Sequence, residues 1–211
     1  MQTIDLNNFP HLDFAQSHLE FCQPEHYPQL QTILSDTKTM QNLMFMSNHN
    51  KGGWTLEQVT ERETRWNKLR EENKDISYII KDKASEKIVG TCGLKDVSFL
   101  HQSAEYGNII HHPYWGKSFA ATAHYLVLDL AFSQLNLHRI QFVTSIHNTR
   151  NITFKKNLGI TQESICKESI YNPQTQTLDD QVIFSLMSYQ WPKVKQNLLK
   201  KIQKQSQEIS F

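Results

Sequence analysis

Hydrophobic residues recur along the chain at two spacings, and each spacing predicts one kind of element. Residues 117 to 134 carry apolar side chains three or four positions apart, which predicts a helix: Ala120, Ala123, Leu126, Val127, Leu130 and Ala131. After Trp191, apolar residues at 194, 198 and 202 are four apart, with lysines at 193, 195, 200, 201 and 204. This tail predicts a basic amphipathic helix whose lysines form a solvated face.

Three further helices are predicted from signals at their ends. Pro24 opens a helix that reaches about Leu34, because proline is tolerated in a first turn. Thr55 and Gln58 have the spacing of a capping box, which starts a helix that runs to about residue 73. Residues 148 to 158 predict a short helix that ends at Gly159, a residue suited to a left-handed C-cap.

Short runs of β-branched and aromatic residues between turn signals predict strands. They span residues 18–22, 76–80, 88–94, 105–111, 139–145, 160–170 and 181–187, the last two joined by the polar loop 172–180. Helices and strands alternate along the chain, so we expect one α/β domain with a mixed, strongly twisted sheet flanked by helices. This domain is expected to occupy residues 1–192, followed by the basic helix or tail at 193–211.

Composition narrows the class of protein. The chain has 211 residues with 38% hydrophobic and 20% charged, which indicates a globular domain. A formal net charge of +1 does not favour nucleic acid as a partner. The three cysteines are far apart, so neither a disulfide framework nor a zinc site is expected. We find no signal-peptide pattern and no apolar run that spans a bilayer, so a cytoplasmic protein without membrane contact is expected.

The segment from His112 to Ala120 joins a predicted strand to a helix N-terminus. Small residues at Gly116, Ser118 and Ala120 let a ligand approach the backbone, and the first N–H groups of a helix favour an anion such as pyrophosphate. Lys117 can add a positive charge. The segment is also consistent with an ordinary tight turn that Trp115 anchors in the core. On residue types alone, both interpretations stand.

Several segments then resemble one family in the right order. Residues 104–107 (AEYG) and 113–117 (PYWGK) are similar to a signature of the RimJ/RimL branch of the GNAT acetyltransferases. Residues 131–140 (AFSQLNLHRI), 147–151 (HNTRN) and 157–160 (NLGI) continue the likeness, which covers about residues 76 to 192. The chain departs from the branch at Asn108, Ser118, Asn151 and Lys155. Some members of the family carry a general-acid tyrosine at the position of Lys155.

The resemblance implies a GNAT fold that binds acetyl-CoA as co-substrate, with no metal. The pyrophosphate would lie on the backbone of the turn at Trp115, Gly116, Lys117, Ser118, Phe119 and Ala120. The pantetheine arm would pair like a strand with backbone groups of Ile109, Ile110 and His111, and Asn148 would lie near it. We expect Ser118 to have ordinary helical dihedral angles, so that its N–H still faces the pyrophosphate.

The reaction implied by the resemblance is acetyl transfer to a primary amine. Glu105 is the candidate general base, acting directly or through a water, although a salt-bridge residue or an exposed strand residue is an equal alternative for it. Asn151 is the candidate hydrogen-bond donor toward the sulfur. Tyr106 should face away from Glu105, because successive strand residues point to opposite faces.

The implied acceptor is a protein N-terminal α-amine, with a small amine such as a polyamine or an aminoglycoside as the alternative. A non-catalytic acyl-CoA-binding protein is the hypothesis from a different class, and a homodimer is compatible with either. Met40, Met44 and Met46 are consistent with an acceptor cleft or with core packing. For His111 and His112 we expect no metal site, since neighbouring strand residues diverge.

Overall fold

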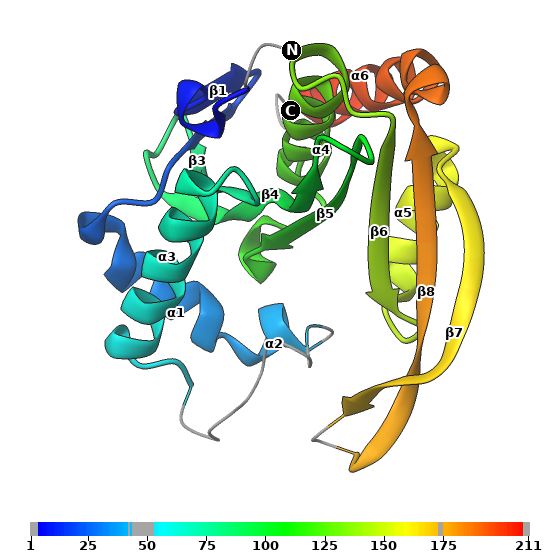
Figure 1. Cartoon of the computed structure of the whole chain (residues 1–211). Helices are drawn as coiled ribbons and strands as arrows, with labels where there is room; N and C mark the ends of the chain where they lie inside the picture. Colours follow the sequence, from blue (N-terminus) through cyan, green and yellow to red (C-terminus); the bar gives the residue numbers. More distant parts are fainter. Residues whose placement is uncertain (1–3, 42, 44–52, 173–174, 209–211) are drawn as a thin grey trace.

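A computed structural model describes residues 4–41, 43, 53–172 and 175–208 of the chain. Its centre is one eight-stranded sheet with the order β1-β2-β3-β4-β5-β6-β8-β7 (Figure 1). The strands are β1 His11–Phe14, β2 Ser17–Glu20, β3 Ile76–Asp82, β4 Ile88–Ser98, β5 Ser103–Ile110, β6 Arg139–Ser145, β7 Thr161–Asn172 and β8 Thr177–Met187. Neighbouring strands are antiparallel except β5 and β6, which are parallel. The predicted mixed sheet is therefore confirmed.

Helices cover both faces of the sheet. They are α1 Tyr27–Ser35, α2 Thr37–Met40, α3 Leu56–Glu71, α4 Phe119–Asp129, α5 Thr149–Leu158 and α6 Trp191–Glu208, and α4 continues as one π-helical turn, Leu130–Gln134. The predicted capping box is confirmed, because Thr55 Oγ1 accepts from the N–H of Gln58 at 3.2 Å and Gln58 Oε1 accepts from the N–H of Thr55 at 2.9 Å. Gly159 ends α5 with a φ of 82°, as its sequence position predicts.

Two apolar cores lie on opposite faces of the sheet. The main core packs α4, α5 and α6 against alternate strand residues such as Tyr78 on β3 and Tyr106 on β5. The second core packs α1 and α3 against strand residues that point to the other face, such as Ile79 on β3 and Ile109 on β5. This alternation assigns a face to every residue of β5, so Glu105 shares the α1–α3 face with Ile109 while Tyr106 points to the α4 face.

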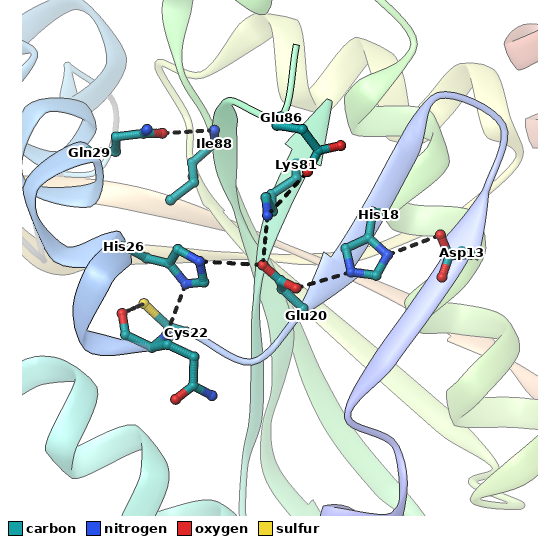
Figure 2. Close-up of polar contacts among 10 residues, drawn as sticks. Asp13, His18, Glu20, Cys22, His26, Gln29, Lys81, Glu86 and Ile88 are labelled. Carbon is teal, nitrogen blue, oxygen red and sulfur yellow. Dashed lines mark hydrogen bonds and ion pairs between the residues drawn. The ribbon is translucent and has the colours of Figure 1, made fainter. Parts of the chain in front are cut away.

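The N-terminal strand prediction is wrong in extent. Residues 18–22 were expected to form one strand, whereas β1 and β2 form a hairpin that ends at Glu20. Mostly polar strand residues gave this hairpin a weak hydrophobic signal. β2 pairs with β3 from Ser17 with Asp82 to Glu20 with Ile79. An ionic contact adds to this pairing, because Glu20 accepts from Lys81 Nζ of β3 at 3.1 Å, and the same carboxylate faces His18 and His26 at 3.1 Å and 3.4 Å (Figure 2).

Three other expectations change at the periphery. The polar loop predicted at 172–180 is shorter, because β7 extends to Asn172 and β8 begins at Thr177. The tail helix begins at Trp191 and buries Val194 and Leu198 in the main core, so it docks on the domain. Met40 is buried in the second core, while Met44 and Met46 lie outside the described residues. Among the described helices, none is long and apolar enough to cross a membrane.

Candidate functional site

The sheet opens between β5 and β6. The two strands pair at Ser103 with Arg139, Ala104 with Ile140 and Glu105 with Gln141, and no later pair joins them. A cavity of about 700 Å³ occupies the opening. Its walls come from β4, β5, β6, the turn before α4, α4 itself, α5, α6 and α3. Figure 1 shows the two strands separating beyond their paired ends.

The register of β5 decides which backbone groups face the opening. Gly90 pairs with Ile110, and the N–H of His111 donates to Val89 O at 2.8 Å. In an antiparallel ladder this pattern turns the N–H and C=O of Ile109 toward β4 and those of Asn108 and Ile110 away from it. The expectation that Ile109 and His111 offer backbone groups is therefore wrong in register. Asn108 and Ile110 border the open edge instead.

One of these outward groups is already occupied. The indole of Trp115 donates from Nε1 to the carbonyl oxygen of Ile110 at 2.7 Å. This bond fixes the end of β5 against the turn that follows. The remaining backbone groups on this edge, chiefly of Asn108 and the N–H of Ile110, are the ones left for a ligand lying along the strand.

Part of the turn before α4 lines the cavity, namely Trp115, Gly116, Lys117 and Ala120, whereas Ser118 and Phe119 are buried and do not line it. Gly116 has a φ of 84°, a conformation that glycine adopts without a steric penalty. Ser118 has a φ of −72° and a ψ of 0°. The expected negative φ is confirmed, but the ψ lies outside the helical range, so the prediction of ordinary helical dihedral angles is only partly right. As the N-cap residue, Ser118 makes no side-chain capping bond. Its Oγ accepts from Gln16 Nε2 instead, and the first N–H groups of α4 keep their partial positive charge.

Two cations lie beside this turn, and a third lines the same cavity. Lys117 Nζ lies 4.8 Å from the centre of the Tyr114 ring, and the Arg150 guanidinium lies 4.8 Å from that of Trp115. Lys201, from α6, lines the same cavity. Sequence reasoning proposed Lys117 but missed Arg150 and Lys201. No spacing signal links residue 201 to the turn, because the docking of α6 alone brings them together.

Glu105 lies at the mouth of the opening, on the α1–α3 face. Its carboxylate is 3.9 Å from Lys95 Nζ, and its side chain is 29% exposed. Burial raises the pKa of Glu105 above its usual range, and the Lys95 ammonium partly opposes this shift. Tyr106 is buried on the other face, as predicted, with its hydroxyl 3.2 Å from His124 Nδ1.

Helix α5 presents a chain of polar groups to the opposite wall. Asn148 Oδ1 caps the helix by accepting from the N–H of Asn151 at 3.2 Å. Asn151 donates from Nδ2 to Thr144 Oγ1 at 3.2 Å and accepts at Oδ1 from Lys155 Nζ. Both the Nδ2 and the Oδ1 of Asn151 therefore already have hydrogen-bond partners within the protein. Lys155 and His124 also line the cavity, and sequence reasoning assigned neither of them a role in it.

The geometric argument about His111 and His112 is wrong. β5 ends at Ile110, so the two histidines do not alternate on a strand, and His112 begins a 3-10 turn. Their ring nitrogens and a carboxylate oxygen of Asp36 lie within 4.8 Å of one another, a grouping that can hold a metal ion. His112 Nδ1 is 2.8 Å from Asp36 Oδ2, which also accepts from the N–H of Thr39 at 2.7 Å. The cluster thus joins α2 to the end of β5.

The chain has an α/β fold with a cavity between two diverging parallel strands, and comparison with known families identifies its family. The model of the acetyltransferase (GNAT) domain matches residues 18–161. Since this is more than half of the 211 residues, the chain belongs to the GNAT acetyltransferase family.

One curated relative matches about half of the chain. Spermidine N(1)-acetyltransferase of Vibrio cholerae is 29% identical over 115 residues, which are 54% of this chain and 66% of that protein. The match thus spans less than two thirds of that relative's length.

Solved structures share the fold over most of the chain. A spermidine N-acetyltransferase from Vibrio cholerae, crystallised with CoA and spermine, superposes with a TM-score of 0.71 at 20% identity, covering 84% of this chain and 98% of that one. The ribosomal-protein-S5-alanine acetyltransferase from Vibrio fischeri superposes with a TM-score of 0.70 at 20% identity, covering 86% of this chain and 98% of that one. At such identities the likeness concerns the fold.

Proposed function

We propose that this protein is an acetyl-CoA-dependent N-acetyltransferase that acts on a primary amine. The observation that carries the proposal is the cavity between β5 and β6, which is lined both by the turn before the N-terminus of α4 and by the half-buried carboxylate of Glu105. A long ligand with a phosphate end and a reactive end matches such a cavity.

The cavity has the features that acetyl-CoA needs. The uncapped N-terminus of α4 would hold the pyrophosphate, with Gly116 allowing close approach and Arg150, Lys117 and Lys201 adding positive charge. The open edge of β5 at Asn108 and Ile110 would accept the amide-bearing arm as an extra strand. Asn148 lines the same wall, with its side chain used as the cap of α5.

Glu105 supplies the base in this proposal. An amine acceptor arrives as an ammonium at neutral pH and attacks only after losing its proton. A carboxylate whose pKa is raised by burial is a better proton acceptor than an ordinary glutamate. Its place on the α1–α3 face leaves the amine to enter from the side that Arg62 and Trp66 of α3 border.

For the acceptor we favour a protein N-terminal α-amine. Of the described residues that line the cavity, Glu105 alone carries a carboxylate. The sequence from 37 to 56, part of which borders the acceptor side, contains no Asp or Glu. Arg62 pairs with Glu63 and Lys95 faces Glu105, so the acceptor wall has no excess of negative charge. A polycation needs such an excess, whereas a peptide N-terminus carries one charge beside neutral amides.

The second candidate is transfer to a polyamine, and the spermidine acetyltransferase among the relatives is the observation that favours it. A competition assay separates the two. Equal concentrations of spermidine and short peptides with free or blocked N-termini are incubated with enzyme and acetyl-CoA, and products are identified by mass spectrometry. We expect acetyl groups on free peptide N-termini. Preferred acetylation of spermidine would overturn the acceptor assignment and leave the acetyl transfer intact.

A further inference from the structure

Asp36, His111 and His112 form a compact group of metal-binding side chains outside the cavity. Asp36 stands between α1 and α2, and the two histidines follow the end of β5. One carboxylate oxygen and one ring nitrogen of each histidine lie within 4.8 Å of one another. Over the residues that the structure describes, no other three His, Cys, Asp or Glu side chains meet this spacing. Two imidazoles and a carboxylate are a common ligand set for first-row divalent metals.

The backbone of each of these residues is held by the fold. The N–H of His111 donates to Val89 O of β4 at 2.8 Å, and the N–H of His112 donates to Thr39 Oγ1 at 2.9 Å. Asp36 caps α2, because its Oδ2 accepts from the N–H of Thr39 at 2.7 Å. Only side-chain torsions therefore need to adjust when an ion binds, which keeps the entropic cost of forming the site small.

The spacing and chemistry of the group suit zinc better than calcium or magnesium. Zinc bonds to nitrogen and oxygen of about 2.0–2.2 Å place the ligands of a tetrahedral site roughly 3.4 Å apart. The rings of His111 and His112 are perpendicular, with centres 5.5 Å apart, so small rotations can direct one nitrogen of each toward a common point. Calcium and magnesium prefer oxygen ligands, whereas imidazole favours Zn²⁺ and its neighbours in the first transition row.

A simple ion pair explains only part of this arrangement. His112 Nδ1 is 2.8 Å from Asp36 Oδ2, and this contact accounts for two of the three residues without a metal. It does not account for the His111 ring, whose nitrogen lies within 4.8 Å of the ligand atoms of both. His111 is therefore the residue that separates the two interpretations.

We propose that Asp36, His111 and His112 bind one Zn²⁺ or a chemically similar divalent ion, with water completing its coordination. The His112 and Asp36 side chains are 32% and 22% exposed, so water can reach the ion. None of the three is among the described residues that line the cavity, so the ion would stabilise structure and take no part in acetyl transfer. It would tie α2, whose Thr39 lines the cavity, to the segment that leads to Trp115. This site is independent of the proposed function.

The test is a zinc titration of the full chain after treatment with EDTA and transfer to chelator-free buffer. Calorimetry with ZnCl₂ compares wild type with Asp36→Asn, which can still cap α2, with His111→Asn and with His112→Asn. His101→Asn, at an exposed histidine, is the matched control. We expect one Zn²⁺ per chain, affinity at least about 30-fold weaker in each of the three variants, and the control within about 2-fold. Zinc at about 100 times its Kd should raise the Tm of wild type by about 5 °C.

The Tm of each protein in EDTA shows whether the variant is folded before its zinc affinity is interpreted. No Zn²⁺ binding by wild type tighter than a Kd of about 100 μM would overturn the proposal. Equal affinity in wild type and a folded His111→Asn would leave only the ion pair at this position. Zinc binding unchanged in all three variants would place the ion elsewhere, for example on the exposed Cys166 thiol, and would also overturn the assignment.

Discussion

Glu105 and Gln141 are the last pair of residues through which β5 and β6 are joined. The carboxylate therefore stands where the sheet opens, half-buried, with a pKa that burial has raised. In physical terms the strand separation creates both the space for a ligand and the apolar surroundings that make the carboxylate a stronger base.

Replacing Glu105 with Gln should lower kcat/KM for the amine about 10²- to 10³-fold and leave acetyl-CoA affinity within about 2-fold. The expected loss follows from removing the base while keeping the size of the side chain. Stopped-flow or steady-state thiol release measures the rate, and calorimetry measures the affinity. Activity within about 3-fold of wild type would remove Glu105 from the chemistry.

Lys95→Met separates the two roles considered for Glu105. Lys95 opposes the rise in the pKa of Glu105, so its removal should move the acid limb of kcat/KM to higher pH without abolishing activity. If the ion pair itself were what matters, Lys95→Met would lose as much activity as Glu105→Gln at every pH. The comparison is made across a full pH profile of both variants.

The stability of the fold should depend on Lys155 in a pH-dependent way. Burial lowers the pKa of Lys155 to about 7, so the folded chain holds this proton only to about that pH, whereas the unfolded chain holds it up to about 10.5. Between those values the unfolded state binds more protons, so stability rises with pH, by on the order of 4 kcal/mol in total. Lys155→Met should raise Tm by several degrees at pH 7, with the gain shrinking toward pH 10. A lower Tm for Lys155→Met than for wild type at pH 7, with the Tm of Lys156→Met, an exposed control on the same helix, unchanged, would contradict the claim that burying this ammonium costs stability.

Substitutions at Gly116 and at Ser118 are expected to affect acetyl-CoA affinity differently. Gly116→Ala places a side chain at a φ of 84° with no atom within 4 Å of the new Cβ, so the cost is conformational. We expect about 1 kcal/mol of lost stability and an acetyl-CoA Kd raised about 5-fold. Ser118→Gly should change that Kd less than about 2-fold, because Ser118 already has a favourable backbone. A large gain in affinity from Ser118→Gly would contradict the proposed geometry of the turn.

The cations around the turn should act on cofactor affinity alone. Arg150→Gln and Lys201→Gln are each expected to raise the Kd for acetyl-CoA roughly 5- to 10-fold, since each removes one charge-assisted contact to a phosphate. The effect should shrink as salt concentration rises, because the partly exposed charges are screened. Measured kcat at saturating acetyl-CoA should stay within about 2-fold; a drop of 10-fold or more would place these residues in the chemistry instead.

Local sequence signals predicted the ends of helices well. They did not predict which backbone groups of β5 face the neighbouring strand β4. The capping box at Thr55 and the C-cap at Gly159 depend on neighbouring residues, so their geometry follows from the sequence directly. The backbone direction of Ile109 depends on its pairing with β4, which one sequence does not reveal. For the same reason the sequence showed neither that Lys201 lines the cavity nor that His111, His112 and Asp36 lie together. These positions arise from tertiary packing of distant segments.

The central claim is that the cavity between β5 and β6 binds acetyl-CoA and transfers its acetyl group to a primary amine. The most direct measurement is thiol release from acetyl-CoA by wild type and Glu105→Gln, with and without peptide or polyamine acceptors, alongside CoA binding by calorimetry. Our account predicts that CoA binds both proteins and that thiol appears with an acceptor in wild type and falls at least 100-fold in the variant. CoA binding without acceptor-dependent thiol release would instead indicate an acyl-CoA-binding protein, and no CoA binding would contradict the proposed site altogether.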